Sequence, residues 1–147
     1  MTGTTTSSNE AAWAPLFFAW VVALAASLGA LFIGEVMGQT PCVLCWYQRA
    51  FMFPLAFVLA VAAFRTDRDI WRYALPLSGV GVLVAGYHVL LFYGFVTEAL
   101  VPCDKSGPSC SDAKMTILGF VPLPILSLVA FVAISVNLLI VRRITVR

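Results

Sequence analysis

Four cysteines in two close pairs are the residues of this sequence with the most specific chemistry. Cys42 and Cys45 form a C-x-x-C element, and Cys103 and Cys110 enclose six residues. Close pairs of this kind are typical of disulfide or metal chemistry rather than of inert core thiols. The compartment in which the pairs lie therefore decides which chemistry is expected.

Arg49 and His88 are the ionisable side chains most able to act with these sulfurs. At about 100° per residue, Cys42, Cys45 and Arg49 fall on one face of a helix, with Arg49 one turn beyond Cys45. His88 lies at a similar depth in another apolar segment. Alone, Arg49 could reach the membrane surface and His88 could bond a carbonyl. Together they favour a site for a lipophilic ligand with a polar head.

The composition places these residues in a membrane protein. Of the 147 residues, 61% are hydrophobic and 11% are charged, and the mean hydropathy is +0.96. This is more apolar surface than a soluble domain of this length can bury. The net charge of +2 includes no basic run, so nucleic acid is not expected as a partner, whereas the lipid bilayer is.

The chain is predicted to be one domain with an all-α fold. Residues 1–14 are mostly small and polar and are expected to form a disordered cytoplasmic tail. Residues 15–147 are expected to form an integral membrane four-helix bundle, because no segment alternates like a barrel strand. The predicted helices are 15–33, 41–64, 73–95 and 117–141, each near the ~20 residues that span a bilayer.

The distribution of basic residues predicts the orientation of these helices. The 65–72 loop and the tail after Val141 hold three Arg each, whereas the two opposite loops hold only Lys105 and Lys114. The excess places both termini in the cytoplasm and both cysteine pairs on the extracytoplasmic side. Thiols tend to be oxidised there, so disulfides are favoured over a metal.

The first pair is expected at the start of the second helix. Thr40 and Pro41 are predicted as its N-cap and first residue, which would place Cys42 and Cys45 in the first turns, where the helix dipole favours thiolates. A zinc site made by all four cysteines stays open as an alternative. Trp46, not His, follows the pair, which argues against covalent haem attachment.

The residues around the first pair closely resemble the disulfide bond formation protein B family (DsbB), and most of all its shorter branch, called BdbC. The similarity is carried by residues 35–49, EVMGQTPCVLCWYQR, and by MFPL at 52–55. It continues through His88, the loop of the second pair and PLPILSL at 122–128. It covers essentially the whole chain from residue 15 onward.

The resemblance implies a quinone-dependent thiol oxidase of the bacterial inner membrane. Its partner would be an extracytoplasmic thioredoxin-fold protein of the DsbA type, and its cofactor would be ubiquinone or menaquinone. By position, Cys103 would form the mixed disulfide with the partner, Cys110 would exchange with Cys42, and Cys45 would engage the quinone. Arg49 and His88 would hold the quinone head.

One departure affects the order of these steps. The second pair here encloses six residues, whereas the better-studied branch of the family has a much longer loop. The order of exchange between the two pairs therefore stays open.

Two other interpretations of the sequence are considered. A relative of vitamin K epoxide reductase is disfavoured because such chains carry their C-x-x-C in a late helix. The remaining alternative is a non-catalytic membrane scaffold with two structural disulfides.

Overall fold

The computed structural model describes residues 4–96, 116–117 and 121–146, and most of them are helical. The elements are α1 (Thr4–Leu31), which continues as the π-helix η1 (Phe32–Val36), then α2 (Val43–Arg65), the 3₁₀-helix η2 (Arg68–Ile70), α3 (Trp71–Phe92), the short antiparallel strands β1 (Thr116–Ile117) and β2 (Val121–Pro122), and α4 (Leu123–Val146).

The four long helices form an all-α integral membrane bundle, as the sequence predicts. The apolar segments Ala11–Val36, Val43–Arg65, Arg68–Phe92 and Leu123–Val146 contain 26, 23, 25 and 24 residues. At about 1.5 Å of rise per residue, each is long enough to cross a hydrocarbon core of about 30 Å.

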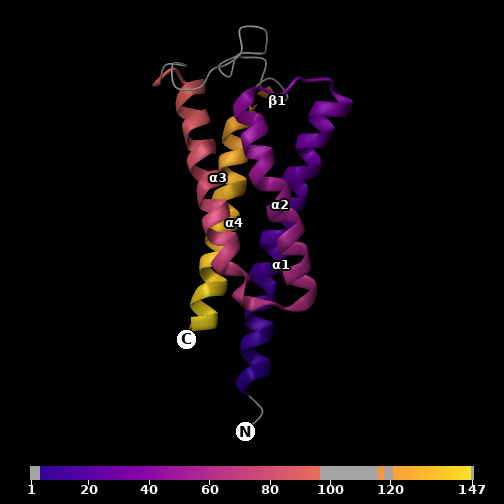
Figure 1. Cartoon of the computed structure of the whole chain (residues 1–147), viewed down its shortest axis with the longest axis vertical. Helices are drawn as coiled ribbons and strands as arrows, with labels where there is room; N and C mark the ends of the chain where they lie inside the picture. The colour runs from indigo at the N-terminus through magenta and orange to yellow at the C-terminus, as the bar shows by residue number, and fades with distance from the viewer. Residues whose placement is uncertain (1–3, 97–115, 118–120, 147) are drawn as a thin grey trace.

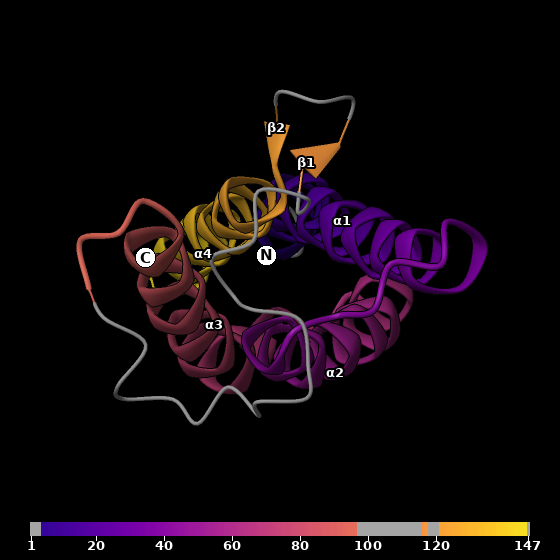
Figure 2. The same cartoon turned by 90° about the horizontal axis from the view of Figure 1, so that it is seen from above.

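The helices form a closed ring in which each packs against its neighbour in the chain, and α1 also packs against α4. Seen from above, the helices follow one another around the ring in chain order (Figure 2). Both chain ends lie at the same end of the bundle as the α2–α3 connection, and the start of α2 lies at the opposite end (Figure 1). The first cysteine pair is therefore remote from both termini.

Two helices differ most in extent from the prediction, and the ends of α2 and α3 differ from it by one to three residues. α1 already begins at Thr4, within the 1–14 segment that the composition predicts to be disordered. A transmembrane helix satisfies its own backbone and extends outward through residues such as Ala11 and Ala12, which are strong helix formers. α4 begins at Leu123 rather than at residue 117, because the described residues before it are extended in β1 and β2. It continues beyond Val141 to Val146, because arginine is a good helix former and suits the negative end of the helix dipole.

Among the described glycines, Gly81 makes the closest contact with a neighbouring helix, where α3 packs against α4. Gly81 of α3 is buried against the ring of Phe131, and a Cβ added at Gly81 would collide with that ring. The hydroxyl of Ser135 donates to the Ser78 hydroxyl at 3.0 Å, which in turn donates to the Leu75 carbonyl at 3.0 Å. Close approach and interhelical hydrogen bonds are the means by which helices associate in lipid.

The Gly81 contact gives a test of this packing. We expect Gly81→Ala to lower the free energy of unfolding by about 1–3 kcal/mol, because the new methyl group overpacks the interface. Gly79→Ala is the matched control, since Gly79 lies on the same helix and a Cβ added there would meet no atom of another element within 4 Å. Thermal unfolding in detergent measures both, and an unfolding temperature for Gly81→Ala equal to that of the control would contradict the packing described here.

Candidate functional site

The sulfur of Cys42 caps the start of α2. Cys42 has an extended backbone, with φ −70° and ψ 171°, and its Sγ accepts a hydrogen bond from the Cys45 amide at 3.4 Å. This is the N-cap position, where a side-chain acceptor satisfies one of the free amides of a helix. The predicted cap at Thr40 is therefore wrong: Pro41 precedes the cap, and the helix begins two residues later, at Val43.

The two sulfurs of the pair lie in different surroundings. Cys42 is buried, with 1% of its surface exposed, whereas Cys45 lines a cavity. Both are present as thiols, and the Cys42 thiol donates to the Cys45 sulfur at 3.1 Å. Cys42 precedes the membrane-spanning segment, and this hydrogen bond, with burial, raises its pKa from 9.0 to about 12. The helix N-terminus therefore does not make both sulfurs thiolates: Cys42 keeps its proton and Cys45 accepts the hydrogen bond.

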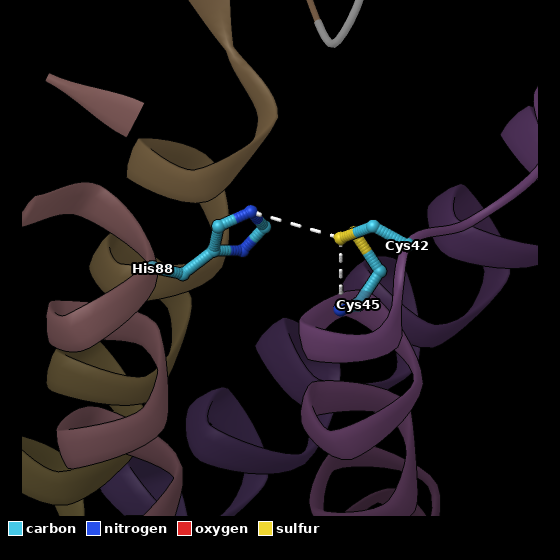
Figure 3. Close-up of side chains that lie close together, drawn as sticks. All are labelled: Cys42, Cys45 and His88. Carbon is cyan, nitrogen blue, oxygen red and sulfur yellow. Dashed lines mark hydrogen bonds between the residues drawn. The ribbon is translucent and has the colours of Figure 1, made fainter. Parts of the chain in front are cut away.

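His88 extends from α3 toward the same sulfur (Figure 3). Its Nε2 lies 3.8 Å from the Cys42 Sγ, and its Nδ1 lies 3.0 Å from the side-chain Nε2 of Gln48. His88 has no exposed surface and Gln48 is 8% exposed. Two helices thus place an imidazole between a thiol and an amide, and the thiol belongs to an apolar cluster that includes Leu44 and Leu91.

Arg49 lies on the other side of this motif, against α1. Its Nη2 donates to the Ala30 carbonyl at 2.6 Å, and its guanidinium carbon is 5.5 Å from the centre of the Trp46 ring. Gly34, in the π-helix η1, leaves room for the guanidinium. In the part of the chain that the structure describes, no carboxylate pairs with Arg49. Its charge is held by a neutral carbonyl and an aromatic ring, so donors remain for another acceptor.

A cavity of about 540 Å³ brings Cys45 and Arg49 together. It lies between α1, α2 and α4, and polar groups line it beside these two residues, among them Gln39 and Gln48. Most of the remaining lining is apolar, including Phe18, Val22, Ala26, Ile33, Met52, Leu126 and Phe131. Its size and its few polar groups are typical of a site for a small apolar molecule with a polar end.

The structure separates the two residues that were expected to hold one ligand. Arg49 lines the cavity, whereas His88 is not among the residues that line it and contacts Cys42 instead. Gln48, which also lines the cavity, was not predicted to be a site residue. The sequence feature that could have indicated Gln48 is its position three residues after Cys45, because residues with this spacing lie on the same face of a helix.

The predicted second pair, Cys103 and Cys110, lies outside the described residues, so the four-cysteine zinc site is not tested. Among the described residues, the two sulfurs of the first pair and one ring nitrogen of His88 lie within 4.8 Å of one another. Such a spacing could suit a soft metal ion. A pair on the extracytoplasmic side would more readily exchange disulfides.

Comparison with known proteins identifies relatives over most of the chain. Residues 11–141 match the family model described as disulfide bond formation protein DsbB. The chain is 56% identical to a probable disulfide formation protein of Metapseudomonas resinovorans, over 89% of this chain and 91% of that protein. It is 39% identical to disulfide bond formation protein C of Bacillus subtilis (strain 168), over 82% and 87% of the two chains. No solved structure gives a significant match.

The different surroundings of the two sulfurs predict unequal reactivity. At pH 8 we expect Cys45 of the reduced protein to react with N-ethylmaleimide at least about tenfold faster than Cys42, because only the thiolate is nucleophilic and the pKa of Cys42 is raised to about 12. Cys42 should react appreciably only as the pH approaches that value. Mass spectrometry of peptides after timed alkylation measures both rates. Protein unfolded in detergent is the control, and a faster reaction at Cys42 in the folded protein would contradict the assignment.

Proposed function

Because this chain belongs to the disulfide bond formation protein DsbB family, we propose that it is a membrane thiol oxidase that passes electrons from an extracytoplasmic thioredoxin-fold protein to a membrane quinone. Membership of the family gives a role in disulfide formation, and the four spanning helices make the chain a multi-pass membrane protein. The electron acceptor, the donor and the residue roles are the proposal.

The observation that carries the proposal is the shared cavity of Cys45 and Arg49. A sulfur that receives electrons from a protein outside the membrane and passes them to a lipid-soluble oxidant has to lie where both can reach it, near the end of a membrane helix. Cys45 occupies that position, two residues after the start of α2. The guanidinium of Arg49 lines the same cavity and supplies a positive charge where negative charge would develop on an acceptor oxygen.

The cavity fits the chemistry of a quinone, either ubiquinone or menaquinone. A quinone accepts two electrons and two protons, and its ring carries two carbonyl oxygens that need hydrogen-bond donors. Arg49 and Gln39 offer donors at the polar part of the cavity. The apolar side chains of α1 and α4 would accommodate the ring and the start of an isoprenoid tail. His88 is left out of this set because it contacts Cys42.

The thiol steps use all four cysteines. Cys103 would form the mixed disulfide with the donor protein, Cys110 would then exchange with Cys42, and Cys45 would be released as a thiolate facing the cavity. Each turnover converts the two thiols of the donor into a disulfide and the quinone into a hydroquinone, so two electrons and two protons leave the donor. A proton retained on Cys42 and a hydrogen bond accepted by Cys45 are consistent with that last assignment.

The orientation completes the proposal. The arginines of the 65–72 loop and of the C-terminal end would face the cytoplasm of a bacterial cell. Both termini would then be cytoplasmic, at the end of the bundle opposite the start of α2 (Figure 1). Cys42 and Cys45 would face the extracytoplasmic side, where an exported thiol protein can reach the loop of the second pair.

Turnover by purified protein tests the proposed function directly. Given a reduced thioredoxin-fold donor and a soluble quinone, the protein should reduce the quinone, and Cys45→Ser should abolish this activity, because a hydroxyl cannot form the disulfide. Thermal unfolding of the variant checks that it remains folded. Quinone reduction that persists in Cys45→Ser would rule out the role of Cys45. Cysteines that never form a mixed disulfide with the donor would instead favour the scaffold.

Gly34 gives an independent test of the role of Arg49. A Cβ at this position would lie 3.0 Å from Arg49 Nη2 and 3.4 Å from Nη1, so Gly34→Ala should displace the guanidinium without removing its charge. We expect the KM for quinone to rise about tenfold, equivalent to ~1.4 kcal/mol, with a smaller change in kcat. Steady-state rates against quinone concentration measure this.

The matched control for Gly34→Ala is Gly86→Ala, which introduces the same methyl group on α3 where no atom lies within 4 Å. Its KM should equal that of the wild type. An unchanged KM in Gly34→Ala would mean that the position of the guanidinium does not matter for the quinone, and Arg49 would lose its proposed role.

A further inference from the structure

The contact between Gln48 and His88 is the feature of this site that the proposed electron transfer does not use. The Gln48 amide nitrogen lies 3.0 Å from His88 Nδ1, and the opposite ring nitrogen, Nε2, lies 3.8 Å from the Cys42 sulfur. The three groups come from two helices and form one chain of contacts. Figure 3 shows the imidazole of His88 directed across the bundle toward Cys42, with Cys45 beside it.

We propose that Gln48 is a positioning residue that fixes the orientation and tautomer of His88, so that Nε2 exchanges a proton with the Cys42 sulfur during the disulfide cycle. The inference rests on the proposed thiol chemistry at Cys42 and adds to it a role for an uncharged side chain. It also moves His88 from the quinone head to the sulfur that does not line the cavity.

The hydrogen bond at one ring nitrogen determines what the other can do. A neutral imidazole has one donor nitrogen and one acceptor nitrogen, and the partner of one sets the state of the other. In the observed arrangement the Gln48 amide donates to Nδ1, so Nε2 carries the hydrogen and directs it at Cys42. A Cys42 thiolate released by exchange would be stabilised by a hydrogen bond from this N–H group.

Proton exchange with Cys42 needs the opposite tautomer, and a carboxamide can support it. If the amide of Gln48 turns over, its oxygen accepts from Nδ1–H and leaves Nε2 free to accept a proton. The Cys42 thiol then loses its proton to Nε2, which makes the ring an imidazolium. The Cys42 sulfur forms the bond to the sulfur of the Cys45 thiolate, and the two electrons released pass to the quinone of the proposed function. In the opposite direction, the imidazolium returns its Nε2 proton to a Cys42 thiolate. A glutamine allows both directions without adding a charge to the apolar cluster.

The burial of the three groups makes the arrangement specific. His88 has no exposed surface, Cys42 is 1% exposed and Gln48 is 8% exposed, so water does not readily replace the Gln48 amide at Nδ1. The other side chains packed around Cys42 are mainly apolar, including Leu44, Leu91, Val84 and Leu123. Among the described residues, Gln48 is the side chain that is hydrogen-bonded to Nδ1.

His88 is the single histidine of the chain, so ¹⁵N labelling of histidine alone gives ring signals that need no assignment. In the reduced wild-type protein we expect a protonated Nε2 and an unprotonated Nδ1. Gln48→Met, of similar shape but without a hydrogen bond, should lose this preference and give averaged or multiple signals. Gln48→Glu, whose carboxylate only accepts, should move the hydrogen to Nδ1. Gln39→Met is the matched control, because Gln39 also lines the cavity whereas Gln48 is the glutamine that is hydrogen-bonded to His88. The ring signals of this variant should equal those of the wild type.

The rate at which the Cys42–Cys45 disulfide forms tests whether the orientation of the His88 ring affects the thiol chemistry. On rapid mixing of reduced protein with a soluble quinone, we expect Gln48→Met to form the Cys42–Cys45 disulfide about tenfold more slowly. Gln48→Glu should recover most of that loss, since it keeps Nε2 as an acceptor. Rescue by a side chain that restores the hydrogen bond would not follow if Gln48 only filled space.

The outcomes separate this inference from the proposed function. Wild-type ring signals in both Gln48 variants, or wild-type rates in Gln48→Met, would overturn the positioning role while leaving quinone-dependent turnover intact. If Gln48→Met does not fold, the hydrogen shift in Gln48→Glu decides the inference alone. A wild-type protein that never reduces quinone would refute the proposed function, even if the ring showed the expected tautomer.

Discussion

A guanidinium at the edge of an apolar span must find a partner, and in this protein that partner is a backbone carbonyl. Arg49 donates to Ala30 at 2.6 Å, immediately before α1 becomes a π-helix. Such segments interrupt the regular hydrogen-bond ladder and often occur at functional sites. Because a carbonyl neutralises none of the charge, the site keeps a positive potential next to Cys45. The π-helix η1, the glycine at position 34 and the cavity all lie next to this contact.

The same short motif gives its two sulfurs different chemistry. Cys42 is the N-cap of α2, buried and hydrogen-bonded, whereas Cys45 is one turn further on and faces the cavity. Sequence spacing alone makes the two residues equivalent members of a pair. Helix geometry makes them unequal, because the cap position directs its side chain back over the helix end. The buried position of one sulfur and the cavity-facing position of the other follow from the backbone conformation of a single residue.

The sequence was sufficient to predict the four helices and the resemblance of the first pair to a family of thiol oxidases, since hydropathy and the motif are local properties. It was not sufficient to predict which residue caps α2 or which side chains contact His88. The helix begins after Pro41 and not at it, so the Cys42 sulfur caps α2 in place of the expected Thr40 hydroxyl. The contact of His88 depends on the rotation of α3 relative to α2, which periodicity does not define when most sides of a helix are apolar.

Tight packing elsewhere in the bundle determines where that imidazole lies. Gly81 lets α3 approach the Phe131 ring of α4, and the Ser78–Ser135 hydrogen bond joins the same two helices. Phe131 also lines the cavity, so one side chain both packs against α3 and forms part of the cavity wall. Close-packed helices transmit small displacements. A shift of α3 would therefore move His88 relative to Cys42 and Phe131 relative to the rest of the cavity wall. The α3–α4 contact thus supports both the thiol chemistry and the quinone binding that we propose.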